Sequence, residues 1–241
     1  MPAENKPAGD AQGYTHLRSH RYERKFLTEE LLPCQVEALV RQHPLMFHAP
    51  YPPRQVNSLY VDTADMQNYY DNVSGAETRR KVRLRWYGAL TGPIARPMLE
   101  IKVKDGLVGK KISYKMASFN LDGDFCDRAF QEAADRSDLP PVVRTDLRTL
   151  SPVLLNCYRR SYHATRDGRF RITVDWRQDF YKINAALCNS LLHRQRNARD
   201  VIVELKYEIE QEPRADRVAG YFPFRISRNS KYVQGIERVY F

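Results

Sequence analysis

The sequence contains neither a long apolar segment nor a recognisable secretory leader. No apolar run approaches the roughly 18 residues that a membrane-spanning helix needs. The first residues are polar and lack the apolar core of a signal peptide. We therefore expect residues 1–20 to be a disordered lead-in, residues 21–241 to form one folded domain, and the protein to be cytoplasmic.

Cysteine and glycine are also used in ways that exclude familiar sites. The four cysteines, Cys34, Cys126, Cys157 and Cys188, are widely spaced and form no Cys-x-x-Cys pair, which argues against a disulfide framework or a zinc site. In the segment 106–110 (GLVGK), two residues separate the glycines, whereas a P-loop requires four. If this protein binds phosphate, it does so without a glycine-rich loop.

Acidic residues are outnumbered: 39 Lys and Arg face 29 Asp and Glu, leaving a formal net charge of +10. Such an excess favours an anionic partner: nucleic acid, acidic lipid or a small polyphosphate. The positions of the basic residues along the chain narrow this choice. In residues 81–87 (KVRLRWY), basic side chains alternate with large apolar ones, and residues 98–104, 152–162, 169–176 and 201–208 alternate similarly. Because neighbouring side chains of a strand point to opposite faces, each segment predicts a strand with one charged and one apolar face.

Two structures are compatible with this alternation. The charged faces are either the wet side of a half-exposed antiparallel sheet or the interior of a barrel whose outside is covered by helices. The closely spaced basic residues favour the barrel, and so do Trp86, Phe170 and Trp176, whose apolar bulk on the opposite faces needs covering. Shorter strands are predicted at 22–27, 55–61, 110–115 and 179–182, and helices at 122–135, 140–150, 214–221 and between Thr28, as N-cap, and Pro44.

Eight short motifs occur in an order that resembles a known family. They are RYERK at 21–25, SLYVDT at 58–63, KVRLRWY at 81–87, LEIK at 99–102, YRRSY at 158–162, RITVD at 171–175, VELK at 203–206 and SKY at 230–232. Together they resemble the VTC domain, the polyphosphate polymerase domain of the triphosphate tunnel metalloenzyme superfamily. The resemblance extends from about Arg21 to Val239, nearly the whole predicted domain.

The resemblance implies an α+β fold: an antiparallel eight-stranded β tunnel barrel, with helices packed outside, formed by residues 21–241. The basic residues that it implies as catalytic tunnel lining are Lys25, Arg83, Arg85, Lys102, Lys111, Arg160, Arg171, Arg228 and Lys231. Tyr158 and Ser230 would donate hydroxyl hydrogen bonds to phosphate, and Glu204 would hold Mn²⁺ or Mg²⁺. Glu100 would support the metal or orient a neighbouring lysine. Lys110 competes with Lys111, because adjacent strand residues cannot both point inward.

The implied activity is transfer of the ATP γ-phosphate to a growing polyphosphate chain, with release of ADP. ATP and inorganic polyphosphate are then the partners, nucleic acid is not expected, and a membrane-protein partner stays open. Three alternatives remain. The same tunnel could hydrolyse triphosphate or cyclise ATP, or the protein could be a non-catalytic binder of polyanions or nucleic acid.

Two positions depart from the superfamily pattern. Other members carry E-x-E-x-K on the first strand, but Arg21 occupies the first acidic position here and leaves only Glu23 and Lys25. This departure fits the polymerase branch better than the hydrolytic one. Arg228 stands where a lysine is expected, which keeps the charge but changes its geometry. The regulatory and membrane-spanning parts found with the eukaryotic polymerase domain are not in this sequence.

Overall fold

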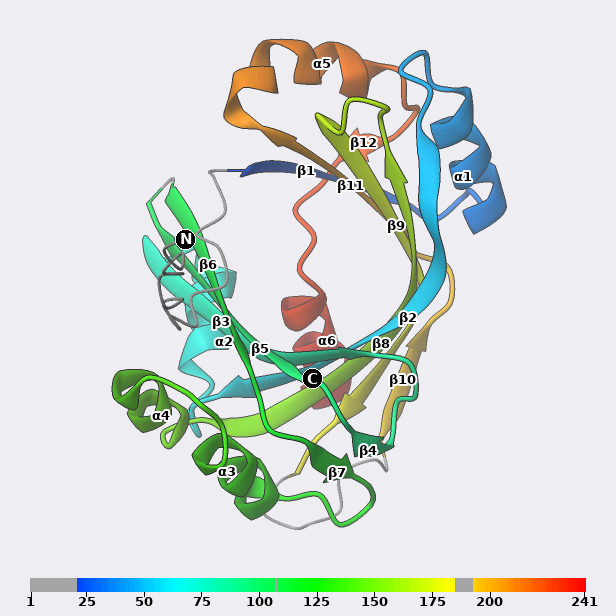
Figure 1. The fold of residues 1–241 in the computed structure, drawn as a ribbon. Coiled ribbons are helices and arrows are strands. Elements are labelled where there is room, and N and C mark those ends of the chain that lie inside the picture. Colours follow the sequence, from blue (N-terminus) through cyan, green and yellow to red (C-terminus); the bar gives the residue numbers. More distant parts are fainter. Residues whose placement is uncertain (1–20, 107, 185–192) are drawn as a thin grey trace, which may run out of the picture.

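The alternating segments form one large antiparallel sheet in the computed structural model, which describes residues 21–106, 108–184 and 193–241 (Figure 1). Its long strands are β1 (Arg21–Thr28), β2 (His48–Asp62), β3 (Thr78–Tyr87), β5 (Met98–Asp105), β6 (Val108–Lys115), β8 (Ser151–Ala164), β9 (Phe170–Lys182) and β11 (Val201–Glu208). Two short strands, β10 (Arg194–Asn197) and β12 (Arg225–Ile226), pair with β9 and β1. The strand order is β12-β1-β11-β9-β8-β2-β3-β5-β6. The expected lead-in, residues 1–20, lies outside the described residues.

The sheet curves around a central space but does not close into the expected eight-stranded barrel (Figure 1). Within the described ranges, the end strands β6 and β12 do not pair with each other, and the sheet has ten strands. The short strands β10 and β12, added to the eight long ones, account for the different strand count. The segments predicted at 169–176 and 179–182 form one continuous strand, β9.

Strand register places the charged residues on the concave face. Lys81 on β3 lies opposite Lys102 on β5, which in turn lies opposite Lys111 on β6. Their neighbours Val82 and Ile101 are buried on the convex face. The alternation read from the sequence is therefore an inside–outside pattern, with the polar residues inside the curve.

Helices cover the convex face, as predicted. The helices α1 (Pro33–Gln42) and α5 (Glu212–Gly220) pack over β1, β9 and β11. The helices α3 (Asp127–Asp135) and α4 (Pro141–Leu147), together with a small sheet of β4 (Gly92–Ile94) and β7 (Phe119–Leu121), cover β3 and β5. Phe130 on α3 and Leu147 on α4 are fully buried there. The predicted N-cap was wrong: Thr28 ends β1, and α1 begins at Pro33 with Leu32 before it.

One helix lies inside the curve, so the expectation that helices pack outside holds only in part. The chain from β12 passes through the middle of the curve and enters α6 (Lys231–Tyr240), while α2 (Gln67–Ser74) lies beside α6 (Figure 1). Neither helix was predicted. Tyr232 and Ile236 of α6 pack on Tyr60 and Leu154 of the concave face. In the described part of the chain, helices fall short of the length and apolar character required to span a membrane.

Gly235 allows α6 to approach the sheet closely. A Cβ atom at this position would lie 2.5 Å from a methyl carbon of Leu154 and 2.7 Å from the ring of Phe180. No side chain or other heavy atom lies near a Cβ atom built at Gly220, in α5. The close packing of α6, which has Ser230 and Lys231 at its start, therefore requires a glycine at position 235.

We expect Gly235→Ala to lower the free energy of unfolding by about 1–3 kcal/mol, because the added methyl group overpacks this contact. The matched control Gly220→Ala should be neutral or stabilising, since alanine favours a helix more than glycine does. Urea denaturation of both variants measures the difference. Equal stabilisation by the two substitutions would contradict the close packing of α6.

Candidate functional site

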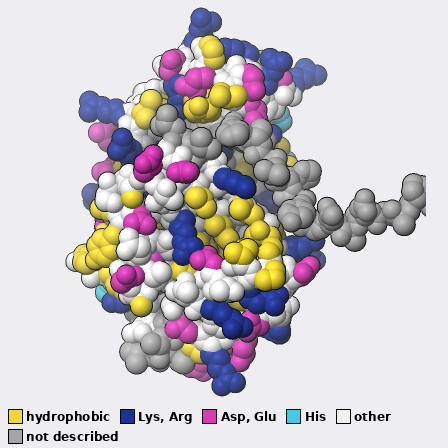
Figure 2. All heavy atoms as spheres, turned by 90° about the vertical axis from the view of Figure 1, so that its left-hand side faces the viewer, with side chains coloured by type: hydrophobic (Ala, Val, Ile, Leu, Met, Phe, Trp, Pro, Cys, Tyr) yellow, Lys and Arg dark blue, Asp and Glu magenta, His cyan; other side chains and the backbone are white. Residues whose placement is uncertain are grey.

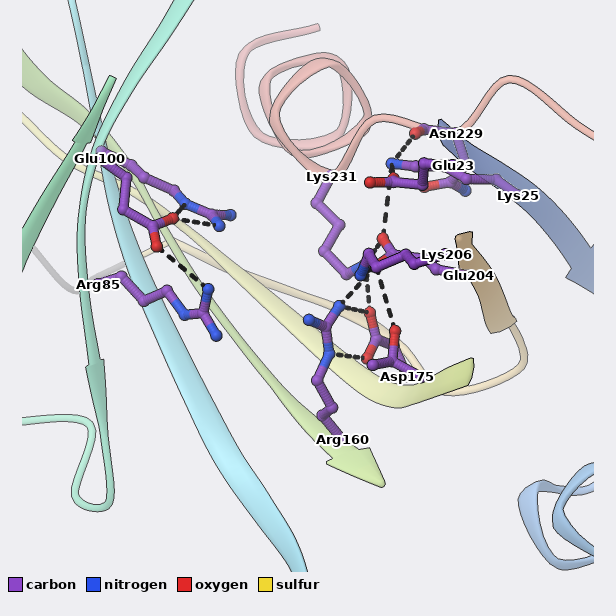
Figure 3. A network of polar contacts seen from close by, with 12 residues as sticks. Glu23, Lys25, Arg85, Glu100, Arg160, Asp175, Glu204, Lys206, Asn229 and Lys231 are labelled. Atoms are coloured by element: carbon purple, nitrogen blue, oxygen red, sulfur yellow. Dashed lines mark hydrogen bonds and ion pairs between the residues drawn. The ribbon is translucent and has the colours of Figure 1, made fainter. Parts of the chain in front are cut away.

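The concave face holds its basic side chains around carboxylates on two opposite walls (Figure 3). We call Arg83, Arg85, Glu100 and Lys111, from β3, β5 and β6, the Glu100 cluster. We call Lys25, Arg160, Asp175, Glu204, Lys206 and Lys231, from β1, β8, β9, β11 and α6, the Glu204 cluster. Thus most of the site residues implied by the resemblance lie in one of two ionic networks.

In the Glu100 cluster, one carboxylate holds three cations. Arg83 donates from Nε and Nη2 to Glu100 Oε2, at 2.9 and 2.6 Å. Arg85 Nη1 lies 3.3 Å from Oε1, and Lys111 donates to the same oxygen. Burial by itself would raise the pKa of Glu100, but the cations, Arg83 foremost, hold it well below its usual range. Lys110 instead lies opposite Val103, so its side chain belongs to the other face from Lys111.

In the Glu204 cluster, two buried carboxylates pair with four cations. Arg160 donates to both oxygens of Asp175, at 2.5 and 2.7 Å, and to Glu204 Oε2 at 3.1 Å. Lys231 Nζ lies 2.6 Å from Asp175, while Lys206 Nζ lies 2.5 Å from Glu204. Burial favours a raised pKa for Glu204, yet Lys206, Arg160 and the other cations lower it well below the ordinary value.

Lys25 connects this cluster with the start of α6. Its Nζ lies 3.1 Å from Glu23 and 3.5 Å from Glu204, and it donates to the backbone oxygen of Asn229 at 3.0 Å. Ser230 is the N-cap of α6, and its Oγ accepts hydrogen bonds from the Val233 amide and from Lys81 Nζ, the latter at 2.8 Å. The structure thus gives Ser230 a helix-capping role, and its hydroxyl hydrogen is not needed for the cap.

The ring of Tyr158 packs beside two cations of the Glu204 cluster, Arg160 and Lys231. Tyr158 is buried, and its ring centroid lies 4.8 Å from Lys231 Nζ and 5.3 Å from the Arg160 guanidinium carbon. Such positions allow cation–π attraction. The structure therefore shows Tyr158 supporting two cations through its ring.

Three of the implied lining residues stand apart from both clusters. Lys102, Arg171 and Arg228 are exposed, and none forms an ion pair with another described residue. Lys102 lies between Lys81 and Lys111 in the strand register, and Arg171 lies opposite Lys206. Their charges are consequently not neutralised by neighbouring described side chains.

The motif-based prediction missed Lys81, Asp175 and Lys206. Each shares a face with a predicted site residue two or four positions away on its own strand, so strict use of the alternation would have found them. Lys81 is distinctive because it donates a hydrogen bond to a hydroxyl, Ser230 Oγ, rather than to a carboxylate. Burial, followed by repulsion from Lys25 and Lys102, lowers the pKa of Lys81 from 10.5 to about 7.

The carboxylates do not by themselves form a metal site. Across residues 21–106, 108–184 and 193–241, no group of three or more His, Cys, Asp or Glu side chains is placed to hold a metal ion. Glu204, the implied ligand, has four cations around it. Mg²⁺ is usually held by one or two carboxylates together with water and substrate phosphates. Glu204 with the nearby Glu23 therefore fits a divalent cation only when phosphate oxygens complete its coordination.

A family comparison identifies the domain. Residues 20–240 match the model of the VTC domain, which covers nearly the entire chain. The chain belongs to the VTC domain family. This membership, with the curved antiparallel sheet and its basic concave face, supports a triphosphate tunnel domain. A search of curated proteins finds no match to this VTC domain.

Solved structures show similarity in fold. A putative adenylate cyclase from Vibrio parahaemolyticus aligns with a TM-score of 0.51 and 11% identity, covering 90% of this chain and 98% of the other. The PH1819 protein from Pyrococcus horikoshii aligns with a TM-score of 0.47 and 11% identity, covering 90% and 99%. At 11% identity, the Vibrio structure supports the fold of this VTC domain only. The chemistry of the site has to be argued from the residues of this chain.

We expect the stability of the protein to depend on pH through Lys81. Its pKa in the folded state, about 7, lies below its ordinary value of 10.5, so the unfolded chain binds more protons between these limits. Stability from this group should therefore rise with pH, by about 2 kcal/mol between pH 7 and pH 9. Urea unfolding at both pH values measures the increment.

The variant Lys81→Met should lose that increment. Lys110→Met is the matched control, because Lys110 is an exposed lysine on the opposite face of the sheet, and it should retain the increment. Identical pH dependence in wild type and Lys81→Met would show that Lys81 is not held neutral by its surroundings.

Proposed function

We propose that this VTC domain is a polyphosphate polymerase that transfers the γ-phosphate of ATP to the end of an inorganic polyphosphate chain and releases ADP. The observation that carries this proposal is the excess of positive charge on one wall of the concave face. Around Glu100, the one carboxylate that the described residues place there, that wall presents five basic side chains: Lys81, Arg83, Arg85, Lys102 and Lys111. A triphosphate brings about four negative charges to such a wall.

The opposite wall is closer to neutral. There Lys25, Arg160, Arg171, Lys206 and Lys231 face three carboxylates, those of Asp175, Glu204 and Glu23. A phosphate chain between the walls would therefore be drawn toward β3, β5 and β6. Arg83 and Arg85 offer planar forks of N–H donors for phosphate oxygens, while Lys102 offers an unpaired point charge. These contacts hold the chain and stabilise the charge that spreads over the transferred phosphoryl group.

The transfer itself needs little from the protein beyond positioning. An oxygen of the terminal polyphosphate group forms a bond to the γ-phosphorus, and the bond from that phosphorus to the ADP oxygen breaks. The nucleophile is already ionised, so the reaction requires no general base. The basic lining reduces repulsion between the two anionic reactants and keeps them in line.

Glu204, with Glu23, would hold Mn²⁺ or Mg²⁺ together with phosphate oxygens. Such an ion supplies charge screening and orientation of the phosphates. The cations around Glu204 keep its carboxylate ionised and ready for this role, since they hold its pKa well below the ordinary value. Glu100, enclosed by Arg83, Arg85 and Lys111, is better placed to orient those cations than to hold a metal.

Two alternatives to polymerisation are nucleic-acid binding and triphosphate hydrolysis. A nucleic-acid binder needs an exposed basic groove with stacking aromatics. On the face in Figure 2, basic side chains are interspersed with acidic and hydrophobic ones and do not merge into one basic patch. Hydrolysis of triphosphate would use the same residues with water as the nucleophile, so the reaction products must distinguish it from polymerisation.

The decisive assay follows ATP with Mn²⁺ or Mg²⁺ by ³¹P NMR, with and without a short polyphosphate primer. We expect internal-phosphate signal to grow in step with ADP. Glu204→Gln should abolish turnover while leaving polyanion binding intact or tighter, because it frees the surrounding cations. Glu132→Gln, on the outer helix α3, is the control and should keep full activity. Orthophosphate as the sole new product would identify a triphosphatase, and tight binding without turnover a binder.

We also expect tripolyphosphate to stabilise the fold, because it relieves repulsion among the clustered cations. At about 100 times its dissociation constant, the ligand should raise Tm by about 5–10 °C. The shift should shrink as salt is added, since salt screens the attraction. Thermal denaturation at two ionic strengths measures this. An unchanged Tm at low salt would count against a polyanion site on the concave face.

A further inference from the structure

Arg54 lies among three tyrosine rings at one rim of the concave face. Its guanidinium carbon is 4.9 Å from the ring centroid of Tyr51, 5.7 Å from that of Tyr162 and 5.8 Å from that of Tyr87. The Tyr51 and Tyr162 rings meet edge to face at 6.1 Å. We call these four residues, from the neighbouring strands β8, β2 and β3, the tyrosine rim.

The tyrosine rim presents stacking surface to solvent. Tyr51 and Tyr87 are 53% and 48% exposed, and Arg54 is exposed as well. Arg54 forms no ion pair with the residues that the structure describes, so the rings are its main partners. A depression of about 450 Å³ lies against Arg54 and Tyr87 and is also lined by Gln55 and Arg159, whose register pair follows that of Arg54 and Arg160 and so belongs to the other face of the strands. Exposed flat rings around a planar cation suit a planar aromatic ligand.

The rim is continuous with the phosphate-binding wall. Arg85 contacts Glu100 through Nη1 and the hydroxyl of Tyr87 through Nη2, so one side chain connects the Glu100 cluster with the rim. On the other side, Arg54 lies opposite Arg160 in the strand register. A ligand whose phosphates contact Arg85 therefore has its next chemical group beside the tyrosines.

We propose that the tyrosine rim is the nucleobase subsite of this domain: it stacks the base of a nucleoside triphosphate whose phosphates lie on the concave face. This inference rests on the proposed function, because it takes ATP as the phosphoryl donor. Stacking on tyrosine and arginine uses the π-face that every base has, so the subsite accepts different bases. The subsite holds the donor nucleotide through its base. Inorganic polyphosphate has no base and therefore does not contact the subsite.

The test compares two ligands by calorimetry in the presence of Mg²⁺. One is the non-hydrolysable β,γ-imido analogue of ATP, and the other is tripolyphosphate, which has no base. Tyr51→Ala and Arg54→Gln should each weaken binding of the nucleotide at least about five-fold, as expected for loss of a base-stacking contact. Both variants should bind tripolyphosphate within two-fold of wild type.

Two controls separate stacking from other effects. Tyr87→Phe removes the hydroxyl that Arg85 contacts but keeps the ring, so the ratio of nucleotide to tripolyphosphate affinity should stay unchanged. Tyr70→Ala removes a tyrosine of similar exposure, 52%, from α2 and should change neither affinity. An equal loss of both ligands in Arg54→Gln would show that the rim contacts phosphate and would overturn the proposal.

These measurements do not depend on turnover. Selective loss of nucleotide binding supports the subsite even if the ³¹P assay shows hydrolysis in place of polymerisation. Unaltered nucleotide affinity in Tyr51→Ala and Arg54→Gln overturns the subsite even if the domain polymerises phosphate. The failure of the proposed function and the failure of this inference are thus distinguishable.

Discussion

Repulsion among basic side chains on one concave surface is the constraint on which this structure depends. Like charges held close together in a partly desolvated space destabilise the fold unless carboxylates or a ligand neutralise them. Glu100, Asp175 and Glu204 provide that neutralisation from within the sheet. Each is enclosed by cations that lower its pKa against the effect of burial, so each stays ionised.

The carboxylates neutralise the two walls of the concave face to different extents, and the more positive wall is the one proposed to bind phosphate. Asp175, Glu204 and Glu23 offset more of the positive charge on their wall than Glu100 does on the wall of β3, β5 and β6. Lys81 shows part of the result: burial first, and then repulsion from Lys25 and Lys102, lowers its pKa to about 7, and its hydrogen bond goes to a hydroxyl. A surface in which a lysine is pushed toward neutrality is one that a polyanion stabilises.

The helix α6 ties the two walls together. Its first residue, Lys231, pairs with Asp175 on one wall, and its N-cap Ser230 accepts a hydrogen bond from Lys81 on the other. Gly235 permits the close packing that seats this helix. The tyrosine rim lies at another part of the concave face and is connected to the Glu100 cluster through Arg85, so the proposed phosphate and base contacts would occupy separate but adjoining places.

The sequence by itself determined which side chains share a face. Because strand side chains alternate, the segment 81–87 placed Lys81 with Arg83 and Arg85 and apart from Trp86, and the family motifs indicated the same face as the site. Alternation does not say which strands adjoin or how far a sheet curves. The pairing of β1 with β11 joins segments about 180 residues apart, and only this folding brings Lys25 to Glu204.

The tertiary structure also decided the open sheet, the position of α6 and the distribution of charge between the walls. These features follow from long-range packing and from electrostatics that depend on distance and burial, neither of which a periodic pattern contains.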